Sequence, residues 1–171
     1  MGCDIHSMAI DKNGSLIEGG RWADGADADP DMEWMEGEGE PFGWRNYSVF
    51  GFLAGVRNYS DVKPISAPRG LPVDVKAPDV DDFDWLGDHS HSWLSVAELE
   101  AFDYDALVED RRYTGQKELP WGGTITSGAC TAEPGNGKMM TWREFLGNDF
   151  FKDVAELRRI GADRVVFGFD N

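Results

Sequence analysis

The chain has 171 residues, 21 of them glycine, and its net charge is −16. This length suits one domain with a hydrophobic core, and the apolar content excludes disorder over most of the chain. Nucleic-acid binding depends on lysine and arginine that neutralise phosphates, so the charge argues against DNA, RNA and anionic membranes as partners. No apolar stretch reaches the roughly 18 residues of a membrane span, and two cysteines are too few for a disulfide framework. We therefore expect a cytoplasmic protein with a single domain over residues 1–171.

The first forty residues predict a β-hairpin and an acidic loop. Residues 3–10 predict a strand, Asn13-Gly14 a tight turn and residues 15–18 a second strand. Residues 24–40 contain eight acidic residues and no basic one, which favours an exposed acidic loop. A divalent-cation site is the alternative for this run, but the Asp-x-Asp-x-Asp-Gly spacing of calcium loops is missing.

The segment that begins at Asn46 predicts a helix followed by an irregular connector. Apolar residues recur at helical spacing from Val49 to Val56, and Asn46 or Ser48 can cap the N-terminus. Residues 61–80 then contain four prolines, which exclude a helix and favour extended backbone before each ring. We therefore expect a stiff, Pro-rich connector over this range.

The middle of the chain predicts short elements. Trp93-Leu94 is expected to continue a short strand, and the capping box that starts at Ser95 predicts a helix to about Phe102. Residues 124–126, between glycines, give a weak strand signal.

The C-terminal third predicts two helices and a buried strand. A capping box at Thr141 starts the first helix, and Asp149 is expected to cap a second one that ends at Gly161. Residues 164–169 are apolar on both alternating faces, which is typical of a strand in the middle of a sheet. We place this strand beside the first one. The expected fold class is α+β: a small mixed or antiparallel sheet, in which the N-terminal hairpin pairs with the C-terminal strand, with three or four short helices and long loops.

All three histidines occur in two short motifs, Asp4-Ile5-His6 and Asp88-His89-Ser90-His91. Residues two apart share one face of a strand, so Asp4 and His6 can present two ligands to one point. His89 and His91 can do the same if their segment is extended. We predict that the two motifs meet in one polar pocket and that His6, His89, His91 and Asp4 are the candidate ligands of a metal ion.

Imidazole and carboxylate ligands suit zinc, manganese, iron or nickel, and three firm ligands with an open position would make a catalytic site. If the protein is an enzyme, Asp4 or Asp88 is the expected general base of metal-assisted hydrolysis. The same residues could instead form a metal-free polar pocket or serve as hydrogen-bonded structural groups. Sequence patterns of hydrolase elbows, phosphate-binding loops and dinucleotide folds are missing.

Three further residues are candidates for ligand binding. Arg69 lies between Pro68 and Pro72, where a rigid backbone can hold its guanidinium ready for a carboxylate or phosphate. Trp93, next to the second histidine motif, can stack on a base or ring, and Arg57 is the third candidate. Core packing of the tryptophan and charge balance by the arginines are the alternatives.

Four motifs together resemble a family of uncharacterised proteins of bacteriophages and their bacterial hosts. These motifs are Met1-Gly2-Cys3-Asp4-Ile5-His6, Arg57-Asn58, Pro68-Arg69-Gly70-Leu71-Pro72 and His89-Ser90-His91-Ser92-Trp93-Leu94. The resemblance covers about residues 1 to 100 and implies an intracellular, phage-associated role, but it carries no established activity. Small phage proteins of this kind often bind a host factor or a nucleotide signal, an analogy that extends to this chain only as an expectation.

Three functions are compatible with these observations. The first is a metal-dependent hydrolase of a small polar, nucleotide-like substrate. The second is a non-catalytic protein that sequesters a nucleotide-derived host signal. The third is an acidic interaction or decoy protein, whose charge attracts basic partners. A homo-oligomer is compatible with all three.

Overall fold

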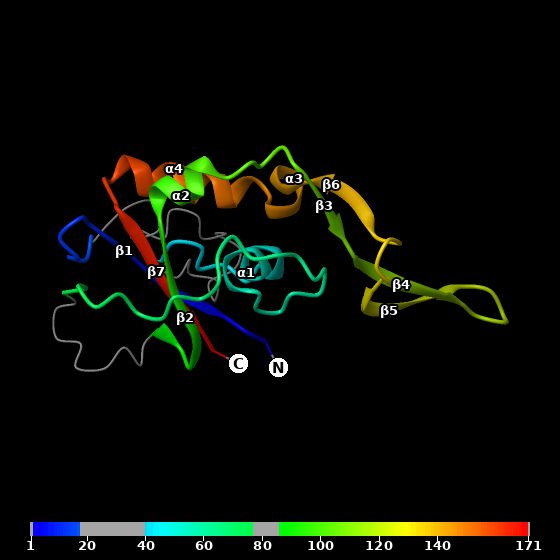
Figure 1. Ribbon diagram of the computed structural model, residues 1–171. Coiled ribbons are helices and arrows are strands. Elements are labelled where there is room, and N and C mark those ends of the chain that lie inside the picture. Colours follow the sequence, from blue (N-terminus) through cyan, green and yellow to red (C-terminus); the bar gives the residue numbers. More distant parts are fainter. Residues whose placement is uncertain (1, 18–39, 77–85, 171) are drawn as a thin grey trace.

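The computed structural model describes residues 2–17, 40–76 and 86–170. Within these ranges it contains a three-stranded antiparallel sheet, four helices and two small two-stranded sheets (Figure 1). This α+β arrangement confirms the expected fold class. In the same ranges, no helix is long and apolar enough to cross a membrane.

The main sheet has the order β1-β7-β2, and β7 runs antiparallel to both neighbours. Its strands are β1 (Ile5–Ile10), β7 (Arg164–Phe169) and β2 (His89–Ser95). In this register His6 is opposite Gly168, and Trp93 is opposite Val166. The central position of the C-terminal strand beside the first strand is therefore confirmed.

The two faces of the main sheet pack against different clusters. Val165, Phe167 and Phe169 face the large hydrophobic core, to which all four helices contribute; we call this side the core face. Val166 belongs to a smaller cluster on the other side, which we call the second face. Because side chains alternate along a strand, Gly168 also lies on the second face.

The N-terminal hairpin forms its turn but only part of its expected pairing. Gly14 adopts a φ of 78°, which suits glycine in a tight turn. Leu16 then forms an isolated antiparallel bridge with Ile10, whereas Ser15 pairs in parallel with Lys76 of the connector. The described part of the connector, residues 61–76, has no helix and no extended strand, as expected. Residues 24–39 of the expected acidic loop lie outside the described residues.

The first helix, α1 (Tyr47–Ala54), begins where the sequence predicts. The Asn46 side chain accepts hydrogen bonds from the backbone N–H groups of Ser48 and Val49, at 3.0 and 3.4 Å. Gly55 ends the helix with a φ of 71°. Seven of the eight helical residues are buried, so α1 is a core helix rather than a half-exposed one.

Replacing Asn46 with Ala is expected to lower the free energy of unfolding by about 1 kcal/mol, because two N–H groups at the start of α1 lose their acceptor. Urea denaturation should show a lower midpoint with an unchanged slope. The control is Asn136→Ala in an exposed turn, which should leave the midpoint nearly unchanged. Equal midpoints for the two variants would contradict the capping role.

Both predicted capping boxes are present. Ser95 caps α2 (Val96–Ala101), and Thr141 caps α3 (Trp142–Leu146). In each case the side chain of the glutamate three residues later accepts a hydrogen bond from the backbone N–H of the cap residue. The last helix, α4 (Asn148–Arg159), starts after Gly147 and has no side-chain cap, so Asp149 lies within the first turn instead of capping it.

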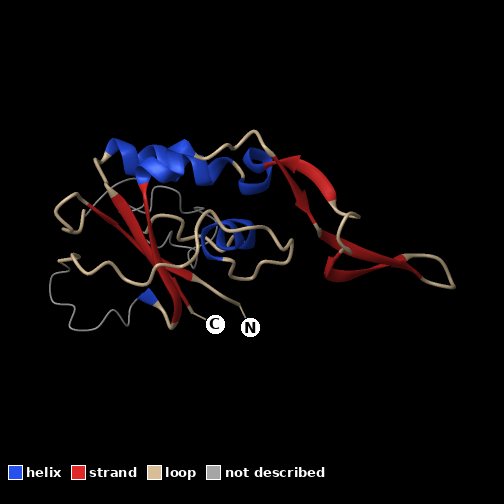
Figure 2. Cartoon of the chain, in the orientation of Figure 1, coloured by secondary structure: helices blue, strands red, loops and turns tan. Residues whose placement is uncertain are grey.

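Residues 107–141 form a projection from the body, which we call the arm. Figures 1 and 2 show it extending away from the main sheet and the helices. Its base pairs β3 (Leu107–Asp110) with β6 (Lys138–Thr141), and its outer part pairs β4 (Arg112–Glu118) with β5 (Thr124–Thr131). The sequence predicted only three residues of β5, because these strands are polar and their sequences show no regular alternation of apolar and polar residues.

Candidate functional site

The two histidine motifs flank the C-terminal end of β7, at one end of the main sheet. On one side, the Asp170 N–H donates to the backbone carbonyl of Asp4 at 3.2 Å. On the other side, the Asp88 N–H donates to the carbonyl of Phe169 at 2.7 Å. The sheet register therefore brings both motifs to the same end of the sheet, and we call this region the sheet-end site.

His6 forms a pair with Asp170, a residue that the sequence analysis did not single out. The His6 Nε2 atom lies 3.0 Å from Asp170 Oδ2, and the other carboxylate oxygen accepts the backbone N–H of Asp4 at 3.2 Å. The hydrogen bond from His6 is the main cause that lowers the pKa of Asp170. An ionised carboxylate can only accept, so His6 donates its Nε2–H.

A second carboxylate lies on the opposite side of the His6 ring. Glu40 Oε2 is 3.9 Å from His6 Nδ1. The same oxygen accepts the backbone N–H of Ser7 at 2.9 Å, which ties Glu40 to β1. The imidazole is thus held between Asp170 and Glu40, and the backbone N–H groups of Asp4 and Ser7 help to fix these two carboxylates.

His91 lies on the same face of the sheet as His6. A Cβ atom at Gly168 would come within 2.6 Å of His91 Cδ2, so the His91 ring occupies the space above this glycine. His6 is the cross-strand neighbour of Gly168, and such neighbours share a face. The His91 Nε2 atom is 2.9 Å from the carbonyl oxygen of Gly87 and must be the donor, because a carbonyl only accepts.

His89 is separated from the other two histidines by a bulge in β2. The register shifts between His89 and Ser92, and Ser90 has a φ of 55°. The His89 ring stacks on Phe169, with 6.1 Å between ring centres, and Phe169 is on the core face. This differs from the regular strand of the sequence analysis, in which His89 and His91 share a face.

The His89 ring nitrogens have different surroundings. Nδ1 is 2.9 Å from the hydroxyl oxygen of Ser90, whereas Nε2 is buried without a hydrogen-bond partner among the described residues. The bulge therefore places a histidine at the edge of the core, where it packs against an aromatic ring.

Asp4 and Asp88, the residues expected as a general base, have different partners in the fold. Both Asp4 carboxylate oxygens accept hydrogen bonds from Arg45, at 2.7 and 2.6 Å, and this pairing raises the pKa of Arg45. Asp88 holds the end of β7 through its backbone N–H.

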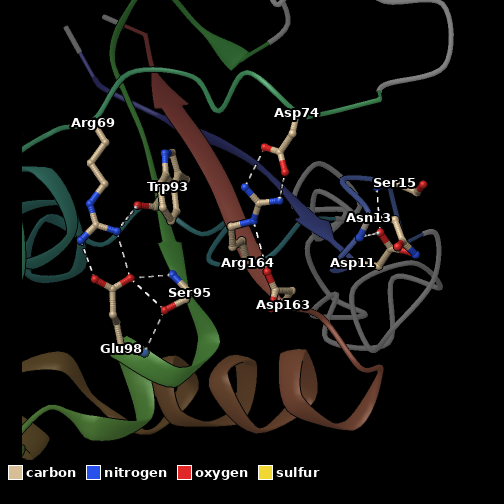
Figure 3. A network of polar contacts seen from close by, with 10 residues as sticks. All are labelled: Asp11, Asn13, Ser15, Arg69, Asp74, Trp93, Ser95, Glu98, Asp163 and Arg164. Carbon is tan, nitrogen blue, oxygen red and sulfur yellow. Dashed lines mark hydrogen bonds and ion pairs between the residues drawn. The ribbon is translucent and has the colours of Figure 1, made fainter.

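Trp93 lies farther along β2, and Arg69 of the connector reaches Glu98 of α2 rather than His6. Figure 3 shows Arg69 in a bidentate ion pair with Glu98; the two N–O distances are 2.9 and 2.5 Å. The guanidinium also lies over the Trp93 ring, 4.7 Å from its centre, and Arg164 approaches that ring at 5.5 Å. Both predicted ligand-binding groups are thus engaged within the fold.

Arg57 lies near the buried end of the first motif. Its Nη2 atom donates to the carbonyl oxygen of Gly2 at 3.3 Å, and its backbone φ is 47°. Cys3 is fully buried, and this burial raises the pKa of the thiol. Cys3 is therefore a core residue.

A hollow of about 500 Å³ lies at the base of the arm, away from the histidines. Arg111 and Arg112 line it, but Arg111 donates to the Ala132 carbonyl and Arg112 pairs with Asp110. Both arginines are therefore engaged by the fold, and we place the candidate site at the sheet end, where the two histidine motifs meet.

The sheet-end site offers two oriented imidazoles and nearby carboxylates. Over the described residues, no three side chains of His, Cys, Asp or Glu are grouped closely enough to hold one metal ion. The sequence does contain a signal for Asp170: it directly follows the predicted central strand, and pairing of Ile5 with Phe169 brings it beside Asp4. Comparisons with protein-family models, with curated proteins and with solved structures found no match to this chain.

Proposed function

We propose that the protein is a metal-dependent hydrolase of a small polar substrate and that the sheet-end site holds the ion. The observation that carries this proposal is the orientation of His6 and His91: both rings donate Nε2–H, one to a carboxylate and one to a backbone carbonyl. Metal-binding histidines commonly have such a partner on the ring nitrogen that does not bind the metal. Asp170 and the Gly87 carbonyl are these orienting partners in the proposal.

The proposed ligand atoms follow from this orientation. A neutral imidazole that donates Nε2–H has its lone pair on Nδ1. His6 Nδ1 and Glu40 Oε2 are 3.9 Å apart, and two ligands of one tetrahedral ion lie about 3.4 Å apart. A small closing movement would let both atoms bind one ion. His91 Nδ1 is the third ligand in this proposal, with water and substrate in the remaining positions.

The surrounding charge favours a cation over a bare anion. Glu40 and Asp170 place two carboxylates beside the His6 ring, and Asp4, two residues away in the sequence, is paired with Arg45. A bound ion would lower the pKa of a coordinated water and offset the repulsion of a negatively charged, nucleotide-like substrate. Asp170 would keep the His6 ring oriented during this reaction.

The test is metal binding by the chain purified without chelators. We expect calorimetry with Zn²⁺ and Mn²⁺ to show binding that weakens about 100-fold in His6→Ala and about 10- to 100-fold in Asp170→Asn. Because protons compete with the metal ion for the imidazole nitrogens, the affinity should fall as the pH is lowered. His89→Ala is the matched control, since this ring packs on Phe169, and it should retain the wild-type affinity.

Two results would overturn the metal site: no binding by the wild-type chain, or equal losses in the His6 and His89 variants. Hydrolysis is measured separately with bis(p-nitrophenyl) phosphate in the presence of the ion that binds. Metal-stimulated turnover that disappears in His6→Ala supports the hydrolase. Metal binding without turnover of this or related esters would instead favour the sequestering function.

A further inference from the structure

Among the described side chains, β4 and β5 of the arm contribute none to either hydrophobic cluster of the fold. β4 and β5 pair only with each other among the described strands, and so do β3 and β6. An isolated two-stranded hairpin is at best marginally stable in water, and three or more strands are usually needed. A further strand would therefore stabilise the arm, and the free edges of β4 and β5 can pair with one.

Exposed apolar side chains are concentrated on the arm. Six large hydrophobic residues of the described chain are strongly exposed, and four of them belong to residues 107–141: Leu107, Tyr113, Trp121 and Met139. Trp121 at the tip is 79% exposed, and Tyr113 is 53% exposed. Surface apolar groups that gather in one projection mark a surface for association.

The charge distribution indicates what kind of partner fits the arm. Residues 107–141 contain four acidic and four basic residues, so the net charge of −16 lies entirely on the remainder of the chain. Two bodies of this charge repel each other at close approach, and this repulsion is screened beyond about 8 Å at physiological salt. Contact through two neutral projections keeps the bodies of two copies apart.

The two edges of the outer arm differ in protection. β4 carries Arg112, Lys117 and Glu118, and such charged side chains discourage pairing along an edge. β5, with the sequence Thr-Ile-Thr-Ser-Gly-Ala-Cys-Thr, contains no charged residue and no proline. An uncharged strand can lie antiparallel beside an identical strand without placing like charges opposite each other.

We propose that the arm is a self-association surface and that β5 pairs antiparallel with β5 of a second copy. A twofold axis between the two strands joins both arms into one four-stranded sheet with the order β4-β5-β5-β4. Such an interface is closed, because the same strand serves both copies. Of the exposed apolar residues of the arm, Tyr113 on β4 then lies on a face of this wider sheet.

The experiment is sedimentation velocity of the full chain over a wide concentration range. We expect the wild-type protein to shift with concentration from the 19.0 kDa monomer to a dimer. Thr126→Lys places a positive charge in β5 of both copies and should raise the dimer dissociation constant about tenfold or more. The matched control is Gln116→Lys, because Gln116 is the cross-strand partner of Thr126 on β4 and receives the same charge at the same height of the arm.

Hydrogen exchange locates the contact independently. The amides of Thr124–Thr131 should become more protected as the concentration rises, whereas those of β1 and β7 should not change. Dimer loss in Thr126→Lys but not in Gln116→Lys supports the β5 pairing. A wild-type chain that remains monomeric, or equal effects of the two substitutions, would overturn it. None of these readouts depends on metal binding at the sheet-end site.

Discussion

Replacing Phe167 with Ala is expected to lower the free energy of unfolding by about 3–5 kcal/mol, because a large aromatic side chain leaves a cavity in a packed core. Phe167 is 0% exposed and lies in β7, between the two other strands of the main sheet. Its ring packs edge-on against Phe169, with 6.0 Å between the ring centres. Both neighbouring strands hold this position in place, which limits collapse around the cavity.

Urea or guanidinium denaturation, followed by tryptophan fluorescence, measures this loss. The control is Val73→Ala, which removes an apolar side chain that is fully exposed in the connector and should change the unfolding free energy by less than about 0.5 kcal/mol. A loss below about 1 kcal/mol for Phe167→Ala would mean that β7 is not the centre of the core.

The position of β7 could be predicted because a strand buried on both faces has a distinctive sequence. Residues 164–169 lack polar alternation, and only the middle of a sheet covers both faces of such a strand. The capping boxes at Ser95 and Thr141 could also be predicted from the sequence, because each depends on two residues three positions apart. Local chemistry fixes these elements before any distant contact forms.

The arm could not be predicted in the same way. Its strands are stabilised mainly by hydrogen bonds between paired backbones, and these bonds leave no hydrophobic period in the sequence. The prediction that Asp149 caps α4 was wrong. Gly147, with a φ of 82°, precedes the helix, so Asp149 already lies inside its first turn. Backbone geometry at Gly147, rather than side-chain capping, sets that boundary.

The sheet-end site was predictable as a meeting of two motifs, but its internal geometry was not. Strand register brings Asp4 and Asp88 to the same end of β7, as the spacing of the motifs suggested. The bulge at Ser90 then turns His89 toward the core face. No local sequence pattern in this segment predicts such a bulge. Asp170 is the partner of His6 across 164 positions of sequence, a contact that only the pairing of β1 with β7 creates.

Replacing Glu98 with Gln is expected to lower the free energy of unfolding by about 1–2 kcal/mol at neutral pH. The ion pair with Arg69 lowers the pKa of Glu98 from 4.5 to about 2. A shift of this size corresponds to about 3 kcal/mol if fully converted, but the side chain is 39% exposed and solvent screening reduces the value. Gln can still complete the capping box, so the substitution removes the charge and not the cap.

The pH dependence follows from the direction of this shift. Between pH 2 and 4.5 the unfolded chain binds a proton at Glu98 that the folded chain does not bind. The contribution is therefore fully present above pH 4.5, decreases as the pH falls, and is lost below about 2. The difference between wild type and Glu98→Gln should shrink in the same interval, as measured by denaturation at a series of pH values.

Glu144→Gln isolates the role of Arg69 in this effect. Glu144 occupies the same capping-box position before α3, and its pKa is lowered chiefly by hydrogen bonds with Thr141 rather than by an arginine. Its substitution should therefore give a smaller loss with a weaker dependence on pH. Identical pH profiles for the two variants would show that capping alone stabilises Glu98. In that case Arg69 would not need Glu98 for the stability of the fold, and its guanidinium could be given up to an anionic ligand at little cost.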